Sequence, residues 1–126
     1  MRPEVTARLK QLETTLTTIE KVMDPEALAA RIRELEAQAG DPSLWDDPAH
    51  AQQVTSELSA AQAKVRKLES LRGRLEDMPV MYELAEEEGD TSLADDELDS
   101  LESAIESLEV TTMPVSYTHL TLPTTP

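Results

Sequence analysis

Apolar side chains recur along most of this chain at alternating intervals of three and four residues. The first such run is Val5, Leu9, Leu12, Leu16, Ile19 and Met23. Positions with this spacing lie on one face of an α-helix, where they can pack against a neighbouring helix. The pattern therefore predicts an amphipathic helix over this segment.

A second helix is predicted to begin in the sequence MDPEAL. Asp24 is a suitable N-cap, Pro25 fits the first helical position, and Glu26 favours the positive end of the helix dipole. Gly40 is expected to end this helix as its C-cap. Its apolar positions are Leu28, Ile32, Leu35 and Ala39.

The longest helix is predicted after the loop GDPSLWDDP, in which Asp47-Pro48 repeats the cap-and-proline start. Its apolar positions are Ala51, Val54, Leu58, Ala61, Val65, Leu68, Leu71 and Leu75. Gly73 costs about 1 kcal/mol relative to alanine, which is too little to end so long a helix. Pro79 is expected to kink or break it around Asp77 and Met78, with VMYELAEEE forming a short further helix.

Gly89-Asp90 reads as a turn before the last helix, whose apolar positions are Leu98, Leu101, Ile105 and Leu108. Most segments therefore carry one apolar stripe and are joined by short turns. The predicted fold is all-α: an antiparallel helical bundle or a long helical hairpin of four to five helices, with a disordered C-terminal tail.

The amino-acid composition excludes several kinds of binding site and several classes of partner. The chain has no Cys and only three Gly, so thiolate metal sites and glycine-rich phosphate loops are excluded. Acidic residues outnumber basic ones 26 to 11, for a formal charge of −15. Such a chain is repelled by phosphate backbones, so we expect basic proteins rather than nucleic acid as partners. No apolar run is long enough for a membrane span, and a cytoplasmic protein is expected.

Few side chains are candidates for chemistry. His50 is expected to be exposed, and His119 is too distant in sequence to form a metal site with it. The acidic run Glu86–Glu88, together with Asp90, Asp95, Asp96 and Asp99, lacks the spacing of a calcium loop. We interpret it as a solvated face, with a docking surface for a basic protein as the alternative. No catalytic, cofactor-binding or metal-binding residue is predicted, and the chain is not expected to be an enzyme.

Trp45 is the only tryptophan and lies in the proline-flanked loop. We expect it to plug the end of the bundle, with its indole N–H bonded to a carbonyl. The alternative is a contact point for a partner.

The stretch DPSLWDDPAHAQQVTSELSAAQAKVRKLESL, followed by YELAEEEGD and LDSLESAIESLEV, resembles the N-terminal region of bacterial peptide chain release factors of the factor 2 type. The resemblance runs from about Glu4 to Met113. The resemblance rests on the LWDDP loop (Leu44 to Pro48), on the helix end ELAEEEGD (Glu83 to Asp90), and on the sequence separation between these two motifs.

The resemblance implies translation termination at UGA and UAA stop codons, with hydrolysis of peptidyl-tRNA on the ribosome. Family members read the codon with Ser-Pro-Phe and promote hydrolysis with Gly-Gly-Gln, and neither tripeptide occurs here. The implied role of this region is docking as a monomer at the stalk base, or GTPase-associated centre, against basic ribosomal proteins. The alternative is an autonomous acidic coiled-coil or helical-bundle scaffold.

The last residues do not follow the family. VSYTHLTLPTTP, residues 115–126, resembles the translation of a transposon-based sequencing adapter, with a natural Thr/Pro-rich tail as the alternative. We therefore expect residues 1–114 to be a truncated helical release-factor domain and residues 115–126 to be a disordered, adapter-derived addition.

Overall fold

The computed structural model describes residues 1–113, which are almost entirely helical. The elements are α1 (Pro3–Met23), α2 (Pro25–Ala39), the 3-10 helix η1 (Pro42–Asp46), α3 (Pro48–Glu87) and α4 (Ser92–Thr112). The all-α prediction is therefore confirmed, with four α-helices among the residues described. The predictions for residues 115–126 lie outside that range and stay predictions. Sequencing the source DNA across codon 113 would test them.

The chain divides into two compact units. Among the described residues, the first, here the three-helix unit, comprises residues 1–22 and 70–113, and the second, here the hairpin unit, comprises residues 23–69.

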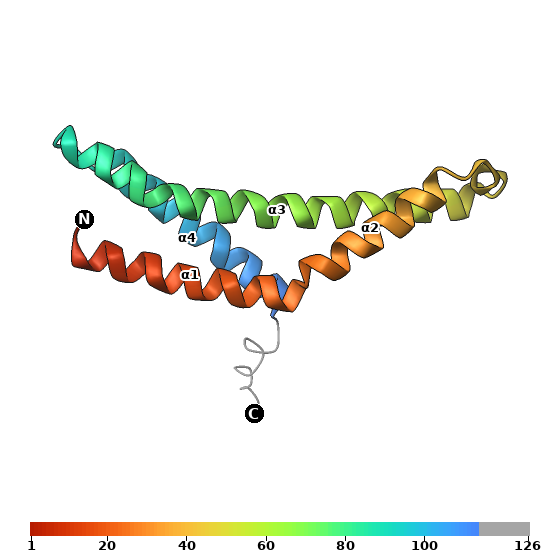
Figure 1. Cartoon of the computed structure of the whole chain (residues 1–126), viewed down its shortest axis with the longest axis horizontal. Coiled ribbons are helices and arrows are strands. Elements are labelled where there is room, and N and C mark those ends of the chain that lie inside the picture. The colour runs from red at the N-terminus through yellow and green to blue at the C-terminus, as the bar shows by residue number, and fades with distance from the viewer. Residues whose placement is uncertain (114–126) are drawn as a thin grey trace, which may run out of the picture. The chain divides into compact units, whose positions relative to one another are not determined.

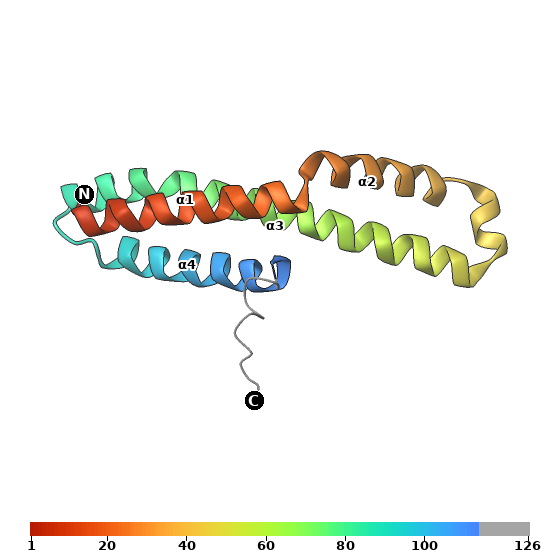
Figure 2. The same ribbon diagram turned by 90° about the horizontal axis from the view of Figure 1, so that it is seen from below.

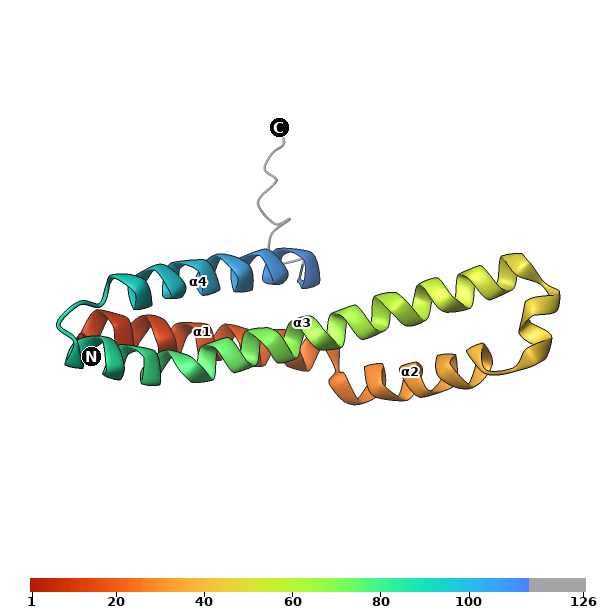
Figure 3. The same ribbon diagram turned by 90° about the horizontal axis from the view of Figure 1, so that it is seen from above.

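In the three-helix unit, α1, the C-terminal part of α3 and α4 lie side by side (Figures 2 and 3). Arg2, just before α1, and Arg8 of α1 bond to Asp95 and Asp99 of α4, so these two helices run in the same direction. The short turn at residues 88–91 reverses the chain, which makes α3 antiparallel to both.

The apolar stripes predicted for these helices meet in the core of the three-helix unit. Leu16, Ile19, Leu98, Leu101 and Ile105 are fully buried. Each contributes about 1.5–3 kcal/mol through removal of its side chain from water. The remaining buried apolar residues of this unit are Val5, Leu12, Leu71, Leu75, Met78, Tyr82 and Ala94.

The hairpin unit consists of α2 packed antiparallel to the first part of α3, with η1 at the end where the chain reverses (Figures 2 and 3). Its core cluster is small and comprises Leu35, Leu44, Ala51 and Val54, with Ala39 and Leu58 packed against it. Leu35 is the buried residue of α2, whereas the predicted stripe positions Leu28 and Ile32 are only half-buried. A hairpin of two helices has few apolar surfaces to cover each stripe.

The predicted helix starts and stops are confirmed by backbone contacts. The Asp24 carboxylate accepts a hydrogen bond of 3.2 Å from the Ala27 N–H, with Pro25 at the first helical position. Gly40 is the C-cap of α2. The Asp47 carboxylate accepts one from the His50 N–H at 3.2 Å, which caps α3.

The prediction of a break at Pro79 with a separate helix after it is wrong, because α3 continues through Pro79 to Glu87 as one helix (Figure 1). The alternative, a kink at this position, stays a prediction. An internal proline costs about 3 kcal/mol, since it removes one backbone hydrogen bond and crowds the preceding turn. Leu75, Met78 and Tyr82 are buried on either side of it. The burial of these side chains offsets the cost of the proline.

Candidate functional site

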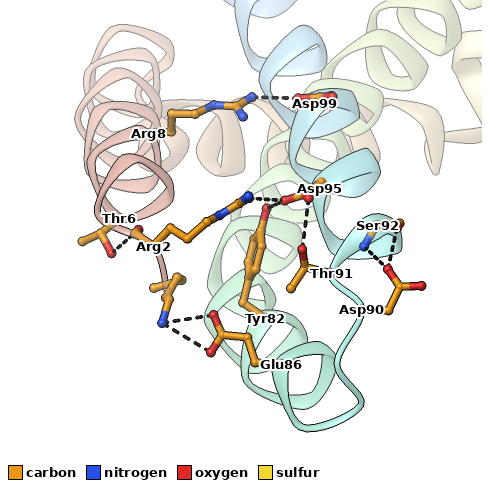
Figure 4. Close-up of polar contacts among 11 residues, drawn as sticks. Arg2, Thr6, Arg8, Tyr82, Glu86, Asp90, Thr91, Ser92, Asp95 and Asp99 are labelled. Atoms are coloured by element: carbon orange, nitrogen blue, oxygen red, sulfur yellow. Dashed lines mark hydrogen bonds and ion pairs between the residues drawn. The ribbon is translucent and has the colours of Figure 1, made fainter.

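A buried tyrosine organises the polar contacts at one end of the three-helix unit (Figure 4). Tyr82 is 1% exposed, and its hydroxyl donates a 2.6 Å hydrogen bond to Oδ1 of Asp95. Arg2, just before α1, donates to the same oxygen at 2.7 Å, and the Thr91 hydroxyl donates to the other carboxylate oxygen at 3.1 Å. Asp95 of α4 therefore links α3 to the residue that precedes α1.

Burial, together with the bond to Asp95, raises the pKa of Tyr82 to about 12. The Tyr82 hydroxyl, followed by Thr91 and Arg2, lowers the pKa of Asp95. A general acid or base needs a pKa near neutrality, and both groups are shifted away from it. The contact thus joins helices and does not suit proton transfer.

Sequence reasoning placed Asp95 on a solvated face and assigned no role to Tyr82. A signal was present, because Tyr82 follows Leu75 and Met78 on the apolar face of the long helix. A tyrosine in such a position needs a hydrogen-bond partner for its hydroxyl. The spacing of apolar residues does not show that this partner is Asp95.

Arginines of α3 bond to several further acidic side chains of the three-helix unit. Arg72 of α3 contacts Glu20 at 2.7 Å and Glu13 at 2.6 Å, both on α1. These bonds, Glu20 first, raise the pKa of the Arg72 guanidinium. Arg74 similarly contacts Glu97 of α4 at 2.8 Å. The arginines are thereby engaged within the unit and not presented to a partner.

The acidic run at the end of α3 remains on the surface. Glu86, Glu87 and Glu88 are exposed, and Glu86 contacts the Met1 amine at 3.1 Å. Asp90 accepts bonds from the Ser92 hydroxyl and N–H, which lower its pKa. Among residues 1–113, no three His, Asp or Glu side chains come close enough to hold a metal ion.

The predicted solvated face is therefore divided in two. Asp95 bonds to Arg2 and is half-buried, whereas Asp96 and Asp99 are exposed, although Asp99 also bonds to Arg8 of α1. His50 is exposed in the first turn of α3, as predicted. His119 lies outside the described residues.

Trp45 does not plug the end of a helix bundle, so the prediction of packing is wrong. Its side chain is 59% exposed, while the adjacent Leu44 enters the core of the hairpin unit. Successive residues of the short 3-10 turn point in different directions, and Leu44 occupies the space facing α2 and α3. The alternative prediction, a contact point for a partner, remains open.

Comparison with known proteins identifies the family. The model of the PCRF domain matches residues 28–117, which include η1 with Trp45. The chain belongs to the PCRF domain family.

PCRF relatives of this chain carry the name peptide chain release factor 2. The protein from Corynebacterium aurimucosum is 74% identical over 116 residues, covering 90% of this chain and 32% of the relative. The protein from Corynebacterium glutamicum strain R is 65% identical over 114 residues, which cover 90% of this chain and 31% of the relative. That from Rhodococcus jostii is 56% identical over 115 residues, with the same coverage. The predicted resemblance is confirmed, and the chain spans about a third of the length of these relatives.

Within residues 1–113 of this PCRF family member, no helix is long and apolar enough to cross a membrane. The described side chains combine internal ion pairs with an acidic exterior. This arrangement can bind a basic surface by charge, but it brings together no nucleophile, base and oxyanion donor.

Proposed function

We propose that this chain is the helical N-terminal domain of a peptide chain release factor of the factor 2 type. Its role is to dock the factor on the ribosome during translation termination in the cytoplasm. The observation that carries the proposal is the 74% identity over 116 residues with a release factor 2.

The electrostatics favour docking against protein. Arg8, Arg72 and Arg74 are bonded to acidic side chains within the three-helix unit. Over the whole sequence the formal charge is −15, which opposes contact with RNA phosphates. Basic ribosomal proteins are complementary to this charge, and we place the docking point at the stalk base, in the GTPase-associated centre.

The chain alone is expected to release no peptide, because it lacks the Gly-Gly-Gln and Ser-Pro-Phe tripeptides that the family resemblance associates with termination. An autonomous coiled-coil scaffold has no supporting observation. The leucines that would form an intermolecular seam, such as Leu16, Leu98 and Leu101, are buried within one chain.

Co-sedimentation with purified bacterial ribosomes tests the proposal. The purified chain should pellet with ribosomes carrying a stop codon in the A site, and added full-length release factor 2 should displace it. Salt should weaken the binding, because the contacts are between exposed charges.

Ribosomes depleted of their stalk-base proteins test where the chain docks, and they should bind the chain less than intact ribosomes do. Equal binding to depleted ribosomes would move the docking point elsewhere. Absence of binding at any salt concentration, with no competition, would contradict the proposed function.

A further inference from the structure

The turn η1 presents Trp45 on a well-ordered support. The Asp41 carboxylate accepts hydrogen bonds from the Ser43 N–H at 3.0 Å and from the Ser43 hydroxyl at 2.9 Å. At the other end of the turn, the Asp47 N–H donates to the Leu44 carbonyl at 3.2 Å. Leu44 anchors the turn in the core cluster of the hairpin unit. Trp45 is therefore held outward by contacts on both sides.

The charge around this turn has one sign. Between residues 34 and 63 the sequence contains no Lys or Arg. The acidic residues of that stretch are Glu34, Glu36, Asp41, Asp46, Asp47 and Glu57. Arg31 and Arg33 lie just before this stretch, and Arg31 is bonded to Glu34 and Glu57. The side chain of Asp46, the residue after Trp45, is exposed and forms no hydrogen bond or ion pair within residues 1–113, so its charge is available to a partner.

An exposed indole, with an exposed carboxylate on the next residue, suits a cationic protein surface. A guanidinium or ammonium group binds the face of an indole, and a carboxylate adds a charge-assisted hydrogen bond. An exposed tryptophan can also stack on a nucleic-acid base. Here the uniform negative charge repels the phosphates that would accompany the base. The complementary occupant is therefore a protein surface bearing Arg or Lys.

We propose that Trp45 and Asp46 form the contact point at which this domain receives an arginine or lysine side chain of a basic ribosomal protein. This inference rests on the proposed function and names the residues that would carry it. Tryptophan is enriched among the residues that dominate protein interfaces, and truncation of such a residue costs at least about 30-fold in affinity.

The first measurement compares variants by co-sedimentation with ribosomes. Trp45→Ala should weaken binding at least about 30-fold, and Trp45→Phe should weaken it less because an aromatic face remains. Leu93→Ala is the matched control, because Leu93 is 81% exposed and lies in the other unit. It should bind as wild type does. Thermal melting should be unchanged in all three, since the replaced side chains are exposed.

The second measurement uses Trp45 as its own reporter, since it is the only tryptophan. Tetra-arginine amide should change its fluorescence emission, whereas tetra-serine amide should not. Asp46→Asn should weaken the tetra-arginine response about 3-fold. Asp77→Asn is the matched control, because it removes the same charge from an exposed position in the three-helix unit and should have no effect.

The outcomes separate the two proposals. If wild type binds ribosomes and Trp45→Ala binds equally well, the contact point is wrong and the proposed function stands. If wild type fails to bind ribosomes but the tetra-arginine response depends on Asp46, the proposed function is wrong and the cation site stands. If protein-free ribosomal RNA binds the chain through Trp45, the assignment of a protein partner is overturned.

Discussion

Replacing Pro79 with alanine should stabilise the protein. Pro79 is exposed within the continuous helix α3, where it has no N–H to donate to the Leu75 carbonyl. Alanine restores that donor and removes the ring that crowds the preceding turn. The buried neighbours Met78 and Tyr82 are not altered.

The size of the effect follows from two opposing contributions. A proline inside a helix costs about 3 kcal/mol relative to alanine. Proline also restricts the unfolded chain, and losing that restriction subtracts about 0.4–1 kcal/mol from the gain. The net stabilisation is therefore about 2 kcal/mol, which corresponds to a rise of about 8 °C in melting temperature for a chain of this size.

Thermal unfolding followed by circular dichroism measures this change, and Gly73→Ala provides the matched control. A Cβ at Gly73 would meet no atom within 4 Å apart from the nearby backbone of its own helix, so this variant should gain only the helix propensity of alanine, about 0.5–1 kcal/mol. If Gly73→Ala raises the melting temperature and Pro79→Ala lowers it or leaves it unchanged, the surrounding core requires the backbone shape that proline imposes. The explanation that Pro79 lowers the stability of α3 by removing one backbone hydrogen bond would then be wrong.

Three further predictions concern other parts of the chain. Leu16→Ala should cost about 2–5 kcal/mol, because Leu16 is fully buried, whereas Val22→Ala should cost under about 0.5 kcal/mol; urea unfolding compares them. Folding raises the pKa of Tyr82 from about 10 to about 12, so the free energy of unfolding should fall as the pH rises through this range. Urea titrations at alkaline pH measure this loss, and Tyr82→Phe should not show it. Asp24 caps α2 with a φ of 54°, a role that asparagine can fill and alanine cannot. Asp24→Ala should therefore lower the melting temperature by about 4 °C or more, whereas Asp24→Asn should leave it nearly unchanged.

Local signals in the sequence were sufficient to predict the helices. The spacing of Leu12, Leu16 and Ile19 follows the period of a single helical face, and caps such as Asp24 and Asp47 act within one turn. Such features depend on near neighbours only, so they can be inferred before the tertiary structure is known.

The features that sequence reasoning missed depend on distant residues. Whether Pro79 breaks a helix depends on how much apolar surface is buried beyond it, and Trp45 is exposed because Leu44 fills the adjacent core. The bond between Tyr82 and Asp95 spans two helices. Propensity and spacing describe none of these contacts, because tertiary packing overrides local preference.

Docking without catalysis is the central claim, and a competition experiment tests it most directly. Ribosomes programmed with a UGA codon and carrying formyl-methionyl-tRNA in the P site are treated with full-length release factor 2 and increasing amounts of this chain. The chain should slow the release of formyl-methionine in proportion to its occupancy, and by itself it should release none. Release by the chain alone, or no effect on the full-length factor at concentrations where the chain is bound to ribosomes, would contradict the account.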